Sequence, residues 1–88
     1  MQVFIVSDTL YPAKNTTING VHSNEINAWK EIEKMYYCDI KFLQQTNNII
    51  ESVKIYEFGM TIEYSSAILP SSKKMIKYII SKRYIDVW

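Results

Sequence analysis

An amphipathic segment that begins near residue 24 sets the first limit on how this chain can fold. Apolar side chains recur in it at intervals of three and four residues, which is the spacing of one helix face. They are Ile26, Trp29, Ile32 and Met35/Tyr36. Ser23 or Asn24 can accept hydrogen bonds from the first free amides and so cap this helix. The segment predicts a helix whose apolar stripe must be buried against another layer.

The segments on both sides of this helix are typical of strands. Val3 to Val6 is apolar on both faces, as in a central strand. A polar loop from Asp8 to Thr16 follows, and alternation then resumes over residues 17–22, where the spacing across Asn19-Gly20 predicts a β-bulge. Residues 39–45 and 49–58 are expected to pair as a hairpin.

Gly59 leaves two alternatives open. The apolar residues from Tyr56 to Tyr64 share one parity, so the strand can continue through Gly59 with a bend. The other reading is a tight turn at Gly59 and a separate strand from Met60 to Tyr64.

The C-terminal part predicts a second helix and a short final strand. Ser71 or Ser72 can cap a helix with an apolar stripe of Met75, Ile76, Ile79 and Ile80. Tyr84 to Trp88 can form the strand. We therefore predict an α+β fold over residues 1–88, one domain with a mainly antiparallel sheet and two helices packed on one face, in the order β-β-α-β-β-(β)-α-β.

Composition indicates one modest core inside a cell. The chain has 88 residues, of which 48% are hydrophobic, enough for a single core. Cys38 is the only cysteine and His22 the only histidine, so neither an intramolecular disulfide nor a structural zinc site can form. Neither a signal peptide nor a membrane-spanning segment is recognisable. We expect a cytoplasmic protein with no metal, no cofactor and no membrane partner.

The opening stretch resembles the start of a known enzyme class. In the string IVSDTLYP…NGV, the residues that match are Asp8, Tyr11, Pro12, Gly20 and Val21. They are similar in kind to the first strand and acceptor-site loop of retaining glycosyltransferases of the GT-B type, although the doubled glycine of that motif is missing. This resemblance implies an N-terminal fragment of such an enzyme.

A second resemblance covers the chain to about residue 58. MQVFIVSDTLY…INGVHSNEINAWKEIEKM is similar to small phage-encoded accessory proteins that begin "MKVYIV" and continue through "GVFS" to a helix. The matching positions are Gly20, Val21, Ser23 and Ala28, and His22 stands where that pattern prefers an aromatic residue. The resemblance implies an origin on a phage or mobile element and a role in binding a host protein, with no catalytic residues.

Two groups of side chains could carry catalysis, and both have simpler interpretations. The first is His22 with Ser7, Asp8 or Cys38. The second is the carboxylates of Asp39, Glu51, Glu57 and Glu63. We interpret His22 as a satisfied strand-end residue, Cys38 as a small core residue, and the carboxylates as charges on the solvent face of strands. The chain is predicted not to be an enzyme.

Charge is distributed unevenly along the chain. Residues 1–70 carry five lysines against eight acidic residues, whereas residues 71–88 carry five basic residues against one acidic residue. The five are Lys73, Lys74, Lys77, Lys82 and Arg83. With Tyr78 and Tyr84 among them, the predicted helix could contact the phosphates and bases of a nucleic acid. A solvated face or an acidic protein partner is the other reading.

Aromatic residues give the leading prediction of function. Seven Tyr, two Trp and three Phe are more than one small core readily hides, and Tyr and Trp are favoured at interfaces. The candidate contacts, for a partner or a homodimer seam, are Tyr11, Tyr36, Tyr37, Tyr64 and Trp88. We predict a non-enzymatic protein-binding module of a phage or mobile element that inhibits or modulates a host protein, such as a defence nuclease. The alternatives are nucleic-acid binding through the basic helix and a truncated GT-B-like fragment.

Overall fold

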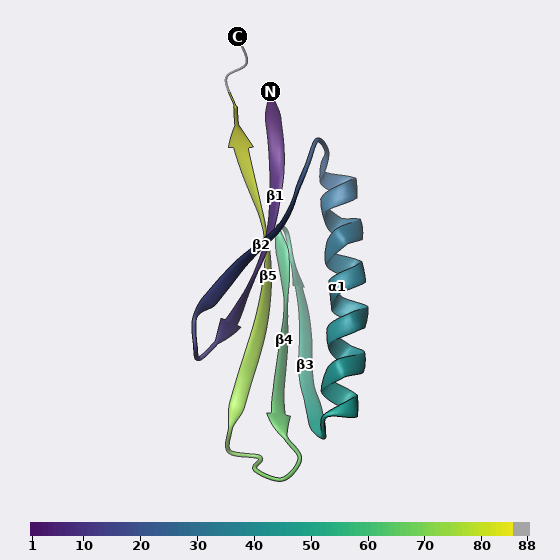
Figure 1. Ribbon diagram of the computed structural model, residues 1–88, viewed down its shortest axis with the longest axis vertical. Coiled ribbons are helices and arrows are strands. Elements are labelled where there is room, and N and C mark those ends of the chain that lie inside the picture. Colours follow the sequence, from purple (N-terminus) through teal and green to yellow (C-terminus); the bar gives the residue numbers. More distant parts are fainter. Residues whose placement is uncertain (86–88) are drawn as a thin grey trace.

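The computed structural model describes residues 1–85, which form one sheet and one helix (Figure 1). In chain order the elements are β1 (Gln2–Tyr11), β2 (Asn15–His22), α1 (Glu25–Gln45), β3 (Asn48–Tyr56), β4 (Gly59–Ser66) and β5 (Lys73–Tyr84). The strands lie in the order β2-β1-β5-β4-β3, and every neighbouring pair is antiparallel. The predicted α+β fold with an antiparallel sheet is confirmed. The first predicted helix is present as α1, whereas the second predicted helix and the predicted element order are wrong, because the described residues follow β-β-α-β-β-β.

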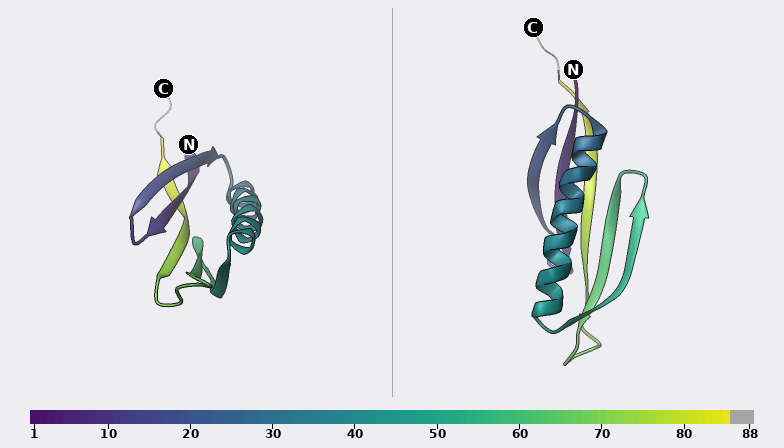
Figure 2. Two further views of the ribbon diagram at one scale, coloured as in Figure 1. Left: turned by 60° about the horizontal axis from the view of Figure 1, so that its bottom comes forward. Right: turned by 90° about the vertical axis from the view of Figure 1, so that its right-hand side faces the viewer.

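The molecule is long and thin because it has only two layers. α1 lies along one face of the sheet, and no described element covers the other face (Figure 2). The Cα radius of gyration is 14.6 Å and the extents are 55 × 21 × 19 Å. A compact chain of this length has a radius of gyration of about 12 Å. The described chain is therefore more extended than a compact domain of this length.

The core lies between α1 and one face of the sheet, which we call the helix face. α1 contributes the buried residues Ala28, Ile32 and Leu43. The helix face contributes Phe4, Val6, Met60, Ile62, Ile76, Tyr78 and Ile80. These sheet residues are all even-numbered, as expected because successive side chains of a strand point to opposite faces. We call the opposite side the open face; in β1, β4 and β5 it carries Ile5, Thr9, Tyr11, Gly59, Thr61, Glu63, Met75, Lys77 and Ile79.

α1 begins where the sequence predicts and ends later. The Asn24 side chain accepts a hydrogen bond of 2.9 Å from the amide of Asn27, which confirms the predicted cap. The predicted strand over residues 39–45 is wrong. No glycine or proline interrupts this segment, and Leu43 continues the buried stripe, so the helix runs to Gln45. Ile26, expected in the stripe, is 69% exposed because it lies about 200° around the helix from Ala28.

The segment predicted as a second helix is strand β5. Its alternate residues Ile76, Tyr78 and Ile80 are buried in the helix face. β5 pairs along its length with β1 on one side and with β4 on the other. The apolar positions of residues 75–80 fit a helix as well as a strand, and pairing with two distant strands decides between them. Of the predicted final strand, Tyr84 ends β5, whereas Asp86 to Trp88 lie outside the described residues.

The hairpin after α1 joins β3 to β4, in place of the predicted hairpin of residues 39–45 with 49–58. Residues 57–58 form its turn and β4 begins at Gly59, so a turn and a separate strand are present as in the second reading, although the turn precedes Gly59 and the strand extends to Ser66. A Cβ at Gly59 would overlap the carbonyl oxygen of Tyr78. Glycine is therefore required here by the close approach of β4 to β5.

The first hairpin confirms the predicted bulge and extends the predicted strand. Val6 pairs with Gly20 and Ser7 with Ile18, so Asn19 is the extra residue of β2. The side chain of Asn19 donates a hydrogen bond of 2.5 Å to Asp8. The polar residues after Val6, expected to form a loop, continue β1 to Tyr11 because they pair with β2 and with β5.

Candidate functional site

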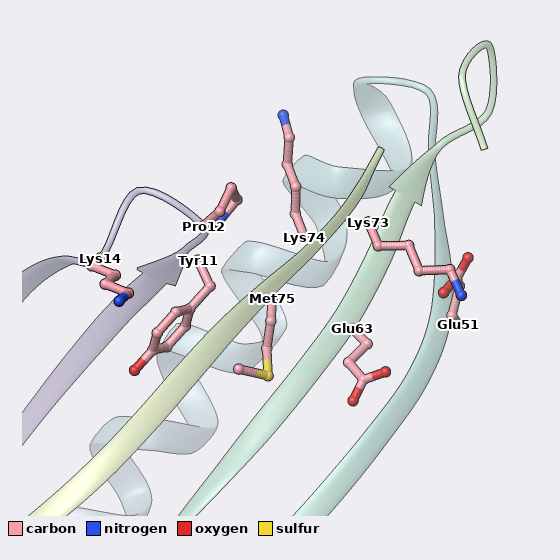
Figure 3. Close-up of a pocket in the computed structure, with 8 residues that line it drawn as sticks. All are labelled: Tyr11, Pro12, Lys14, Glu51, Glu63, Lys73, Lys74 and Met75. Carbon is pink, nitrogen blue, oxygen red and sulfur yellow. The ribbon is translucent and has the colours of Figure 1, made fainter. Parts of the chain in front are cut away.

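Two adjoining hollows lie on the open face. The first, of about 340 Å³, lies between the β1–β2 turn and the start of β5, and Tyr11 and Met75 are among its lining residues (Figure 3). The second, of about 650 Å³, extends over β4 and β5 toward Tyr56 and Ile79. Met75 lines both hollows, so they form one continuous surface along the sheet.

The floor of this surface is built from small and hydroxyl-bearing side chains. Gly59 and Thr61 lie in the second hollow, and the Thr9 and Thr16 hydroxyls share a hydrogen bond of 2.8 Å. Thr9 and Thr61 are only 6% and 5% exposed although no element covers them. The curled sheet and the larger side chains around them shield these residues. A bound molecule would therefore contact the larger side chains around these threonines rather than the backbone.

Basic side chains exceed acidic ones on the open face. The basic residues are Lys14 at the β1–β2 turn, Lys54, Lys73, Lys77 and Arg83. Against these five stand three carboxylates: Glu51, Glu63 and, at the β3–β4 turn, Glu57. Lys54 lies 4.0 Å from Glu63, and Ser65 donates a hydrogen bond of 2.9 Å to Glu51. Within residues 1–85, neither Lys73 nor Lys77 forms an ion pair with a carboxylate. The face therefore carries positive charge that the chain itself does not neutralise.

The predicted basic helix does not exist as one surface. Because the segment is a strand, alternate residues point to opposite sides: Lys73, Lys77 and Arg83 to the open face, and Lys74 and Lys82 to the other. The Lys82 ammonium lies 4.2 Å from the centre of the Phe58 ring, a cation–π contact within the chain.

Tyr78, expected to stack on bases, is fully buried and cannot do so. Tyr84, the other tyrosine expected to stack, is 81% exposed at the end of β5.

The predicted aromatic contacts do not form one patch either. Tyr11 lies on the open face, whereas Tyr36 and Tyr64 are half-buried against the core. Tyr37 is 63% exposed on α1, with its ring 5.4 Å from that of Tyr36. Trp88 lies outside the described residues.

Residues of the open face that the sequence analysis missed are Tyr56, Thr61, Lys54 and, as strand residues, Met75 and Ile79. The alternation of apolar residues at positions 76, 78 and 80 is the sequence signal that could have identified Met75 and Ile79 as strand residues on the opposite face.

A polar link joins α1 to the sheet beneath the helix. Tyr78 donates a hydrogen bond of 2.5 Å to Asp39. Burial raises the pKa of the Asp39 carboxyl above its usual value, and the negative charge of Asp8 raises it further, although the bond from Tyr78 opposes both. Burial and the same bond raise the pKa of Tyr78. Asp39 is thus a helix residue facing the sheet, which corrects its interpretation as a charge on the solvent face of a strand.

A second link lies near the start of α1. His22 and Glu31 share a hydrogen bond of 2.6 Å, as expected of a satisfied histidine at a strand end. Gly20 makes room for it, because a Cβ there would overlap the Glu31 carboxylate.

The structure does not bring His22 to the other candidate catalytic residues. His22 lies opposite Phe4, four residues and about 13 Å along β1 from Asp8. Cys38 is exposed on α1 rather than buried in the core, because the buried stripe passes through its neighbour Asp39 and through Leu43. Among residues 1–85, no three His, Cys, Asp or Glu side chains are grouped as a metal would need.

Comparison of the chain with protein-family models, with curated proteins and with solved structures gives no match. The helix of the described part of the chain is too polar to cross a membrane. The geometry of the open face is therefore the observation from which a function can be argued.

Proposed function

We propose that this chain is a non-enzymatic protein-binding module that holds an acidic surface of another protein on its open face and thereby modulates that protein. The observation that carries the proposal is the absence of a covering layer over five paired strands in residues 1–85, together with the excess of lysine around the two hollows. Apolar and charged side chains lie side by side here, as Met75, Lys77 and Ile79 do on β5, and protein interfaces contain both kinds.

The sequence resemblance suggests what kind of partner this is. We propose a host protein, such as a defence nuclease, bound by an inhibitor that a phage or mobile element encodes. Positive charge around the hollows would steer an acidic partner toward the face and set its orientation. Met75 and Ile79 would supply the apolar contacts.

Site-specific photo-cross-linking in host cells tests this proposal. A photoreactive residue in place of Tyr56, which is 52% exposed on the open face, should cross-link one defined protein. The matched control is the same replacement at Tyr37, which is 63% exposed on α1. Equal capture of the same protein from Tyr37, or no defined product from Tyr56, would count against the open face.

Charge reversal then tests the chemistry of the captured partner. Lys73→Glu with Lys77→Glu should weaken binding at least tenfold, which corresponds to about 1.4 kcal/mol, because two favourable contacts become like-charge contacts. Lys30→Glu with Lys34→Glu on α1 is the matched control and should leave the affinity unchanged. A similar loss in both double variants would contradict binding at the open face.

Single-stranded nucleic acid is a second candidate for the same face. Tyr11 and Tyr56 line the two hollows with lysines beside them, and aromatic rings among lysines are a platform for bases. This candidate predicts oligonucleotide binding that weakens steeply with salt and is lost in Tyr56→Ala. If no oligonucleotide binding is detected at low salt, protein binding remains the proposed function of the open face.

A further inference from the structure

The outer edge of β3 is an unpaired strand edge with an apolar surface. β3 is the last strand in the sheet order, and no described strand lies on its other side. It has nine residues, and Val53 and Ile55 are 39% and 74% exposed although they belong to the helix face. A long exposed edge of this kind pairs readily with another strand.

The bulge in β3 determines which side chains share a face. β3 pairs with β4 through Ile50–Tyr64, Ser52–Glu63, Val53–Ile62 and Ile55–Met60. Because Glu51 is the extra residue, three apolar side chains point to the helix face: Ile50, Val53 and Ile55. The open face carries Ile49, Ser52, Lys54 and Tyr56, with Glu51 beside them through its hydrogen bond from Ser65.

We propose that β3 pairs antiparallel with β3 of a second copy of this chain, about a two-fold axis that passes through Val53. In this register Val53 faces itself, Ile55 faces Ile50 of the second copy, and Tyr56 faces its Ile49. Lys54 faces Ser52 and the bulged Glu51 of the second copy, just as Glu63 of β4 faces them within one chain. Every apolar side chain thus meets an apolar one on the same face, and the lysine meets a carboxylate.

Charge complementarity favours this register over its neighbour. If the axis passed through Lys54, the two Lys54 ammonium groups would lie directly opposite each other, which is unfavourable. With the axis at Val53, each Lys54 lies beside Glu51 of the other copy, and the symmetry provides this contact twice. Of these two registers, the one with the axis at Val53 makes the strand complementary to itself.

The helix face gives a second reason for a second copy. One helix is about 10 Å across and neighbouring strands are about 4.8 Å apart, so α1 cannot cover a five-stranded sheet. Val53 and Ile55 remain uncovered beside it. Pairing through β3 would join these residues from two copies into one apolar strip between the two α1 helices. The sheet would then continue across ten strands.

The other sheet edge lacks this complementarity. β2 contains Asn19 in its bulge and Gly20 next to it, and its first residues are Asn15, Thr16 and Thr17. Ile18 of β2 is 69% exposed and so provides a matched control position on an edge that should stay unpaired.

The native mass of the purified chain, measured by light scattering over a range of concentrations, tests the inference. We expect twice the 10.4 kDa of one chain. Val53→Lys should give a folded monomer, because it places two ammonium groups on the axis, whereas Ile18→Lys should remain a dimer. A monomer at every concentration, a dimer that survives Val53→Lys, or open-ended polymers would overturn the proposal.

Two further measurements test the proposed dimer even if the Val53→Lys variant does not fold. The first uses a Cys38→Ser background, so that only the introduced cysteine can react. Mild oxidation should link the Val53→Cys variant into a disulfide-bonded dimer but should leave the Ile18→Cys variant monomeric on a denaturing gel. Equal cross-linking of both variants would refute the proposed register. Lys54→Glu should weaken the dimer about tenfold, and adding Glu51→Lys should restore it. This dimer pairs the backbone of the β3 edge, although the side chains of Lys54 and Tyr56 lie on the open face as well. A cross-link from Tyr56 to a second copy of this chain therefore reports the dimer, whereas a cross-link to another protein reports the proposed function, so each proposal can fail without the other.

Discussion

Replacing Tyr78 by phenylalanine isolates the bond that ties α1 to the centre of the sheet. Tyr78 is fully buried in β5 and its hydroxyl donates to the Asp39 carboxylate at 2.5 Å. A hydrogen bond to a charged group contributes roughly 1.5–3 kcal/mol. Asp39 keeps partial access to water, which can replace the lost donor, so we expect about 2 kcal/mol. In a domain of this size that loss lowers the Tm by about 10 °C.

A double-mutant cycle shows whether this loss belongs to the bond. Urea unfolding followed by circular dichroism is measured at neutral pH for Tyr78→Phe, Asp39→Ala and the double variant. Tyr78→Phe should cost much less in the Asp39→Ala background, with a coupling of about 1–2 kcal/mol between the two positions. The same cost in both backgrounds would mean that the hydroxyl acts through packing, and the inferred link between helix and sheet would be refuted.

Three further changes test other contacts of the fold. Because the pKa of Asp39 is raised above 3.8 in the folded chain, its carboxyl adds stability below pH 3.8 that is lost as the pH rises through the folded pKa. Asp39→Asn should remove this pH dependence from urea midpoints measured between acid and neutral pH; an unchanged profile would exclude Asp39 as its source. Gly59→Ala should cost about 1–3 kcal/mol in urea unfolding, since its Cβ meets the rigid backbone of Tyr78, whereas Gly20→Ala meets a movable side chain and should cost less. Asn24→Ala should cost about 1 kcal/mol with an unchanged m-value, and a neutral result would show that the cap is redundant.

Local signals in the sequence predicted the parts of the fold that local interactions decide. The side chain of Asn24 caps α1, and the bulge at Asn19 follows from odd spacing across a glycine. Both depend on residues close together in the chain. The first strand, from Val3 to Val6, was equally clear because it is apolar on both faces.

Segments with two compatible periods could not be assigned from the sequence. Residues 39–45 alternate well enough for a strand, yet Leu43 continues the helical stripe. Residues 75–80 fit a helix, yet pairing with β1 and β4 makes them a strand. Because the partner strands are distant in sequence, no local pattern could settle either segment.

The candidate site was harder to predict than the fold. Most residues of the site come from one face of four strands, and the register in which these strands pair brings them together. Tyr11 was predicted as a contact, but Tyr56 and Thr61 were not. Lys73 and Lys77 were predicted as basic contacts on a helix, and they lie on a strand face instead.

The place of β5 in the sheet has a consequence for how the chain matures during synthesis. Of the described strands, β5 is synthesised after the other four, yet it lies in the middle of the sheet and joins the β1–β2 hairpin to the β3–β4 hairpin. Until residues 73–84 emerge, α1 is the only described element that contacts both hairpins, and the strand that joins the hairpins into one sheet is missing. Assembly must then wait for contacts such as Gln2 with Tyr84, which are costly in chain entropy and slow to form. A chain interrupted before β5 would be a substrate for chaperones and proteases rather than a smaller functional protein.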